Sequence, residues 1–202
     1  MKNFDSNIKN WTLPKTDLQL NKTKLRRNLL KQRQSLSVEE WREKSDRICL
    51  QIQTSIQFTQ ATTILAYFSF RQEPDLSPLF TDSQHRWGFP RCVGQSLSWH
   101  LWEPRDPLQS GNYGINEPHS EAPIIHPDEV DLILVPSVAC DQQKYRLGYG
   151  GGYYDRLLSS PAWTKKPTLG VVFDFAYLSQ LPVANWDKPL QSVVTEVKLH
   201  HI

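Results

Sequence analysis

The chain has 202 residues, a length that fits one globular domain with a single core. Lysine and arginine number 23 against 21 aspartate and glutamate residues, so the small net charge argues against a general polyanion binder. Cys49, Cys92 and Cys140 stand far apart, which favours reduced thiols over a disulfide framework or a zinc cage. We find no signal sequence and no apolar run near the ~20 residues of a membrane span, so we expect a cytoplasmic protein.

Residues 1–21 are polar, and we expect them to form an extension that is partly disordered. A helix is predicted from Lys22, because Leu25, Leu29 and Leu36 recur at helical offsets. Basic residues cover its other faces, and from charge alone they indicate a solvent-facing surface. This run extends from Lys22 to Arg33.

Ser37 and Glu40 have the spacing of a capping box, which predicts the start of a second helix. Its buried face is expected to carry Trp41, Ile48, Ile52 and Ile56.

After residue 62 the pattern changes to strand. Apolar runs predict strands at 64–68, 131–136 and 170–173, with further strands near 87–90 and 193–195 and a short helix at 76–80. Leu97, Trp99 and Leu101 alternate with polar residues, as in a half-exposed strand. Helices alternating with buried strands predict an α/β fold with a mostly parallel sheet. Its ligands should bind in the loops after Phe68, Val135 and Phe173, beyond the carboxyl ends of the strands.

The most informative segment is RLGYGGGYYDR at 146–156. Glycine occupies four of the five positions 148–152, which lets the backbone approach a ligand closely. Residues 153–158 predict a helix whose first amides face this loop, an arrangement that suits phosphate. Arg146 adds positive charge, and Asp155 is a carboxylate suited to magnesium. The alternative is a turn that only reverses the chain, but the tyrosines, aspartate and arginines around the glycines favour a binding loop.

Two common nucleotide motifs are excluded by spacing. No Lys-Ser or Lys-Thr follows the glycines, as a GxxxxGK[ST] loop requires, and the third glycine of GxGxxG would fall at Tyr153. The segment is therefore a different kind of phosphate loop.

This glycine segment, with DLILVPSVACD before it, resembles the signature of the 5-formyltetrahydrofolate cyclo-ligases. The resemblance continues through KTKLR at 22–26, RQE at 71–73, GNYGINEP at 111–118, LPVANWD at 181–187 and VVTE at 193–196. It implies a three-layer α/β/α sandwich in which residues 22–202 form one catalytic domain. The chain departs from the family pattern at Ala176, where a glutamine is frequent, and at Cys140, where an aromatic residue is more usual.

The resemblance also implies an activity and a site. ATP and Mg²⁺ would drive conversion of 5-formyltetrahydrofolate, with or without a polyglutamate tail, to 5,10-methenyltetrahydrofolate, ADP and phosphate through a phosphorylated formyl group. No nucleic acid or membrane partner is implied, and we expect a monomer. The implied catalytic residues are Lys22, Arg146 and Tyr153; the ATP contacts are Lys22, Arg26, Arg146, Leu147, Gly148, Tyr149, Gly150, Gly151, Gly152, Tyr153 and Tyr154; the folate contacts are Glu73, Tyr153 and Tyr154; and the magnesium ligands are Asp155 and Asp187.

Several alternatives stay open on sequence grounds. Glu73 could be a surface-loop acid, Asp187 a turn residue, and His100 a structural histidine. A non-catalytic folate- or nucleotide-binding protein could carry the same loop. A nucleic-acid-binding module is disfavoured, because the seven tryptophans are scattered and the net charge is small.

Overall fold

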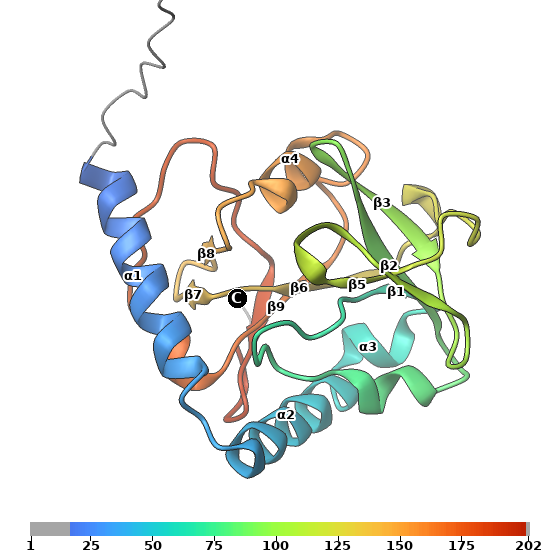
Figure 1. Ribbon diagram of the computed structural model, residues 1–202, viewed down its shortest axis with the longest axis horizontal. Helices are drawn as coiled ribbons and strands as arrows, with labels where there is room; N and C mark the ends of the chain where they lie inside the picture. Colours follow the sequence, from blue (N-terminus) through green and yellow to red (C-terminus); the bar gives the residue numbers. More distant parts are fainter. Residues whose placement is uncertain (1–16, 201–202) are drawn as a thin grey trace, which may run out of the picture.

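The computed structural model describes residues 17–200 (Figure 1). The helices are α1 (Asp17–Arg33), α2 (Val38–Gln53), α3 (Ile56–Gln60) and α4 (Tyr153–Ser159), with 3-10 turns η1 (Ser77–Thr81), η2 (Asn112–Gly114), η3 (Pro127–Glu129) and η4 (Asp174–Ala176). The strands are β1 (Thr63–Leu65), β2 (Arg86–Val93), β3 (Ser96–Leu101), β4 (Leu108–Ser110), β5 (Asn116–Pro118), β6 (Leu132–Pro136), β7 (Ala139–Asp141), β8 (Arg146–Leu147), β9 (Thr168–Val171), β10 (Tyr177–Leu178), β11 (Ser192–Val194) and β12 (Leu199–His200).

A seven-stranded sheet with the order β12-β11-β9-β6-β1-β2-β3 forms the centre of the fold. Neighbouring strands from β11 to β2 run parallel, while β12 and β3 pair antiparallel at the two edges. The predicted mostly parallel sheet is therefore confirmed. The strand predicted from the apolar run 131–136 is β6, in the middle of the sheet.

Side chains along β6 alternate between two cores. Leu132 and Leu134 belong to the core that includes residues of α2 and α3, and Ile133 and Val135 belong to the core that includes residues of α1 and α4. Figure 1 shows α2 and α3 below the sheet and α4 above it. The molecule is thus the expected three-layer α/β/α sandwich, with both faces of the sheet covered.

The helices differ from expectation at two boundaries. α1 begins at Asp17, five residues before its predicted start, and residues 1–16 of the expected extension lie outside the described residues. The Ser37–Glu40 capping box is present, but α2 ends at Gln53. Ile56, expected on the buried face of α2, lies on α3 and is 72% exposed. Ser55 caps the N-terminus of α3, which begins there as a separate helix. On α3 it is Phe58, and not Ile56, that is buried.

Two strands also differ from their patterns. β1 ends at Leu65, three residues before its predicted end, and beyond it the Tyr67 hydroxyl donates to the Pro74 carbonyl. On β3 the expected alternation fails at His100, which is buried because the segment at Ile124 bridges to it. Both ring nitrogens of His100 are hydrogen-bonded, to Ser98 and to Ala122, as the structural interpretation predicts.

β1 and β6 lie side by side in the sheet. After β1 the chain continues to β2 on one side of this pair, and after β6 the next strand of the same sheet is β9, on the other side. Such a switch point leaves a crevice at the carboxyl ends of the two strands, where α/β proteins bind ligands. Of the helices within residues 17–200, none has both the length and the apolar character needed to cross a bilayer.

Candidate active site

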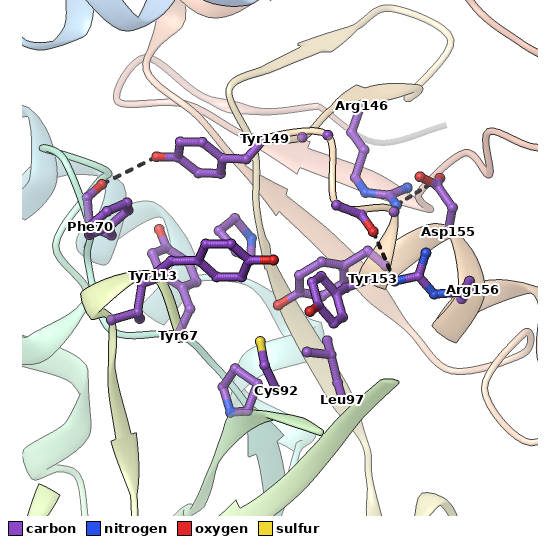
Figure 2. A pocket seen from close by; sticks show the side chains of 18 of the residues that line it. Tyr67, Phe70, Cys92, Leu97, Tyr113, Arg146, Tyr149, Tyr153, Asp155 and Arg156 are labelled. Atoms are coloured by element: carbon purple, nitrogen blue, oxygen red, sulfur yellow. Dashed lines mark hydrogen bonds and ion pairs between the residues drawn. The ribbon is translucent and has the colours of Figure 1, made fainter. Parts of the chain in front are cut away.

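A cavity of about 990 Å³ opens at this switch point and includes Tyr67 and Phe68 after β1 and Pro136 at the end of β6 (Figure 2). Its volume is at the upper end of ordinary ligand sites and leaves room for two substrates. Every residue that the sequence nominated for the site lines this one cavity: Lys22, Arg26, Glu73, the ten residues 146–155, and Asp187.

The glycine loop needs glycine at two positions. Gly150 and Gly152 have φ angles of 108° and 70°, in the left-handed region that other residues rarely adopt. Gly152 is followed directly by α4, so the predicted helix after the loop is confirmed. Arg156 fixes the end of the loop, because it donates to the carbonyls of Gly151 at 2.9 Å and Gln95 at 2.7 Å.

α1 packs against this loop through two basic side chains. Lys22 is only 7% exposed and pairs with the Asp187 carboxylate. Arg26 Nε donates to the Gly148 carbonyl at 2.7 Å, and burial lowers the pKa of Arg26. The solvent-facing interpretation is therefore wrong for Lys22, although Lys24 is exposed as that interpretation expects.

The two nominated metal carboxylates are held on the same wall. Asp155 Oδ1 lies 2.8 Å from Arg146 Nη2 and accepts from the Lys188 amide at 3.4 Å, while Arg146 Nη1 donates to the Lys188 carbonyl at 3.0 Å. The adjacent Asp187 accepts from the Ala184 amide at 2.7 Å, so it is both a turn residue and the partner of Lys22.

These carboxylates fit a magnesium ion that is shared with phosphates. Across residues 17–200 no group of three or more His, Cys, Asp and Glu side chains could hold a metal alone. Mg²⁺ does not need one, because it binds through one or two carboxylates together with substrate phosphate oxygens and water. Asp155 and Asp187 are the right type of donor, and both line the cavity.

Glu73 lies in the part of the cavity next to β1. Its side chain is buried, with the residue 3% exposed, and Oε2 accepts from the Phe70 amide at 3.1 Å. Burial raises the pKa of Glu73 from 4.5 to about 7, although the charge of Arg33 and the amide hydrogen bond oppose this shift. Glu73 is therefore not a surface-loop acid.

Two tyrosines connect the regions of the cavity. The hydroxyl of Tyr154 is buried, and among residues 17–200 it has no hydrogen-bond partner. A hydrogen bond with Tyr113 raises the pKa of Tyr153 to about 12, and the Tyr153 hydroxyl also lies 3.2 Å from the Gly94 carbonyl. An unpaired buried hydroxyl is uncommon in folded proteins.

Sequence patterns did not nominate several lining residues. Cys92, Tyr113, Glu117 and Trp186 line the cavity but were not singled out as site residues. Tyr113 and Glu117 lie within the GNYGINEP segment and Trp186 within LPVANWD, so the resemblance could have pointed to these three, whereas Cys92 lies in none of the quoted segments. At the departure from the family pattern, Ala176 is buried in the core and does not line the cavity.

The fold and the cavity together define an α/β protein with one large small-molecule site, and the basic glycine-loop wall of this site suits an anion. A model of the 5-formyltetrahydrofolate cyclo-ligase family matches residues 19–196. The 5-formyltetrahydrofolate cyclo-ligase of Escherichia coli K12 is 30% identical over 177 residues, which cover 83% of this chain and 96% of that protein. The chain belongs to the 5-formyltetrahydrofolate cyclo-ligase family and is an enzyme of that type.

Solved structures agree with this assignment. The NMR structure of Aquifex aeolicus 5,10-methenyltetrahydrofolate synthetase superposes with a TM-score of 0.80 at 34% identity, covering 89% of this chain and 92% of that one. The Mycoplasma pneumoniae 5,10-methenyltetrahydrofolate synthetase has a TM-score of 0.70 at 22% identity over 87% and 99% of the two chains, and it supports the fold alone.

Proposed function

We propose that this enzyme uses ATP and Mg²⁺ to convert 5-formyltetrahydrofolate to 5,10-methenyltetrahydrofolate, ADP and phosphate. The family assignment supports the overall reaction. The observation that carries the detail is that one cavity joins a basic glycine loop to a buried acid, Glu73. A reaction between a polyphosphate and an uncharged heterocycle needs two such regions in contact.

The triphosphate is assigned to the glycine-loop end. There Gly148 lies in open space and Gly150 has a backbone conformation barred to larger residues, so phosphates can approach the amides of residues 148–152. Lys22, Arg26 and Arg146 line the same wall and would offset the negative charge. The remaining contacts in this assignment are Leu147, Tyr149, Gly151, Gly152, Tyr153 and Tyr154.

Asp155 and Asp187 are the residues that would hold the magnesium ion. When bound, the ion would supply positive charge that offsets the charge of the phosphates. Lys22 and Arg146, which now neutralise these carboxylates, have their cations next to the place where phosphate charge would arrive. Each can then serve the transition state as well as the resting protein.

The reduced folate is assigned to the Glu73 end. Glu73 would accept hydrogen bonds from ring N–H groups, and Tyr153 and Tyr154 would contact the molecule where it meets the phosphates. Apolar side chains such as Phe68 and Leu97 complete the wall and would cover the faces of a flat ring.

The chemistry follows from the poor leaving-group character of an amide oxygen. The formyl oxygen attacks the γ-phosphorus of ATP, and ADP leaves. N10 of the folate then attacks the activated formyl carbon, phosphate departs with the former formyl oxygen, and N10 loses its proton. Such a sequence needs positioning and charge stabilisation more than a protein nucleophile. Lys22, Arg146 and Tyr153 are the groups that we assign to this task.

The competing function is a protein that binds folate or nucleotide without turnover. Its sequence could keep the loop, but it would have no need for two carboxylates beside the phosphate wall. A spectrophotometric assay of the methenyl product decides between the two. We expect product only with ATP and Mg²⁺ together and one ADP per turnover; product without nucleotide, or no product under any metal condition, would contradict the proposal.

We further propose that residues 22–202 act as one catalytic domain, as a cytoplasmic monomer that needs no nucleic acid or membrane. The substrate can carry a polyglutamate tail. Light scattering of the active protein with and without ligands tests the monomer, and comparison of mono- and polyglutamylated substrates tests the tail.

A further inference from the structure

Arg33 is a buried charged side chain that contacts two segments lining the cavity, the 70–73 turn and the glycine loop. It is the last residue of α1 and only 3% exposed. Its Nε donates to the Arg71 carbonyl at 3.0 Å, and its Nη2 donates to the Phe70 carbonyl at 3.4 Å and to the Tyr149 hydroxyl. One guanidinium therefore contacts both the turn that leads to Glu73 and the glycine loop.

The turn that Arg33 holds has an unusual backbone. Arg71 and Gln72 have φ angles of 50° and 55°, so two consecutive residues other than glycine adopt the left-handed conformation. Such strain persists only where the surroundings hold it, and it gathers at functional sites. Besides Arg33, the Gln72 side chain holds the turn by donating to the Leu36 carbonyl at 3.2 Å. The result is that the Glu73 carboxylate points inward and accepts from the Phe70 amide.

Stability alone does not explain an arginine at this place. A buried cation loses its hydration, and apolar residues of similar volume frequently stabilise a fold as well or better. Arg33 also leaves Nη1 buried without a hydrogen-bond partner among residues 17–200. The side chain is thus costly for the fold, and what distinguishes it is the set of groups that it holds.

We propose that Arg33 is a positioning residue: it holds the 70–73 turn and Tyr149 together, so that the Glu73 carboxylate and the glycine loop face one substrate. The identity of that substrate rests on the proposed function, whereas the contacts do not. The titratable groups that act on Glu73 are Arg33 from α1, Tyr67 before the turn, Tyr149 of the loop and Tyr154 of α4. Arg33 is the cation among them, and its charge favours the ionised form of Glu73.

The first test is Arg33→Gln in the ligand-free protein, with the Glu73 carboxyl followed by ¹³C NMR from pH 5 to 9 and assigned with Glu73→Gln. Loss of a nearby opposite charge should raise the titration midpoint of Glu73 by at least about one pH unit. At pH 7 the affinity for 5-formyltetrahydrofolate should fall at least ~10-fold, because the acid is then both protonated and displaced. Arg27→Gln, an exposed arginine on the same helix, is the matched control and should change neither value.

Arg33→Lys separates charge from shape, since lysine keeps the cation but not the planar fork of donors. We expect the Glu73 midpoint to stay within about half a unit of the wild-type value while the folate affinity still falls. If Arg33→Gln does not fold, the measurements on Arg33→Lys test the positioning role. Its loss of affinity should shrink when it is combined with Glu73→Gln, because the two residues act through one contact network.

An unshifted Glu73 midpoint in folded Arg33→Gln, or fully additive losses in the double variant, would overturn the positioning role. If the wild-type protein does not bind 5-formyltetrahydrofolate, the proposed function fails. The ligand-free NMR titration still decides whether Arg33 controls Glu73.

Discussion

At the glycine-loop end of the cavity each carboxylate lies against a cation, in the pairs Asp155–Arg146 and Asp187–Lys22. At the other end Glu73 is buried with its pKa raised to about 7, and within residues 17–200 this carboxylate has no salt-bridge partner. In the proposed reaction the charges of the first region would exchange partners with phosphate and a metal ion. The second region contains a buried carboxyl group that can gain or lose a proton near neutral pH.

This difference separates the two tasks that the proposed reaction combines. Paired charges exchange partners without changing protonation, which suits the arrival of a triphosphate. A lone buried carboxylate instead responds to the hydrogen-bond donors of its ligand, which suits recognition of a heterocycle. If the two ends differ as their geometry indicates, substitutions at one end should change metal dependence and substitutions at the other should change pH dependence.

The largest effect is expected at the glycine-loop end, for Asp155→Asn. The substitution keeps the size of the side chain but removes the charge that would bind a hard cation and that pairs with Arg146. We expect a folded protein whose turnover falls at least ~100-fold and whose magnesium requirement rises, measured in the methenyl assay. Near-normal turnover with unchanged magnesium dependence would show that Asp155 only complements the helix dipole.

Lys22→Met tests the cost of breaking the other pair. The two side chains are each 9% exposed, so the change leaves the Asp187 charge largely buried without its cation. The free energy of unfolding, from urea titration, should fall by about 3 kcal/mol, and part of it should return when Asp187→Asn is added. Lys24→Met, at an exposed position, should stay within about 0.5 kcal/mol of wild type. Equal effects of the two lysines would mean that the pair contributes little.

At the Glu73 end the expected signature is a dependence of stability on pH. The folded protein binds the Glu73 proton more tightly than the unfolded chain, with a pKa of about 7 against 4.5. Stability from this group is therefore complete below 4.5 and is lost as the pH rises through about 7. Between pH 5 and 8 the wild type should lose up to about 3 kcal/mol more than Glu73→Gln does, measured by urea unfolding.

Glu103→Gln, an exposed glutamate, is the control and should follow the wild-type curve. Parallel curves for wild type and Glu73→Gln would contradict the raised pKa and, with it, the contrast between the two ends.

The same contrast explains which features the sequence could predict. Glycines, capping residues and apolar runs act locally, so the loop at 148–152, the Ser37 cap and the central strand β6 were predictable. The groups that interact with the Glu73 carboxylate, Arg33, Phe70 and Tyr149, come from three segments far apart in the chain. Arg33 was hidden in a basic run in which several members, such as Arg27, are exposed. Composition cannot tell these apart, because only tertiary packing buries one and exposes the other.

The smallest expected effect distinguishes two reasons for glycine within the loop itself. A Cβ at Gly148 would meet no atom within 4 Å, and its φ is ordinary, so the fold does not require glycine there. Gly150 has a φ of 108°, where a side chain is strained whatever the space. Gly150→Ala should therefore lower the free energy of unfolding by about 1–2 kcal/mol, while Gly148→Ala should stay within about 0.5 kcal/mol.

For ATP affinity, unlike stability, Gly148→Ala should not be the milder of the two variants. If phosphate approaches the backbone at Gly148, a methyl group there displaces it, and the ATP affinity of Gly148→Ala should fall roughly tenfold despite its normal stability. Calorimetric titration with the nucleotide and urea unfolding of the same samples give both values. Normal ATP affinity in Gly148→Ala would place the phosphates away from this amide, and the assignment of the triphosphate would then have to shift toward Gly151 and the start of α4.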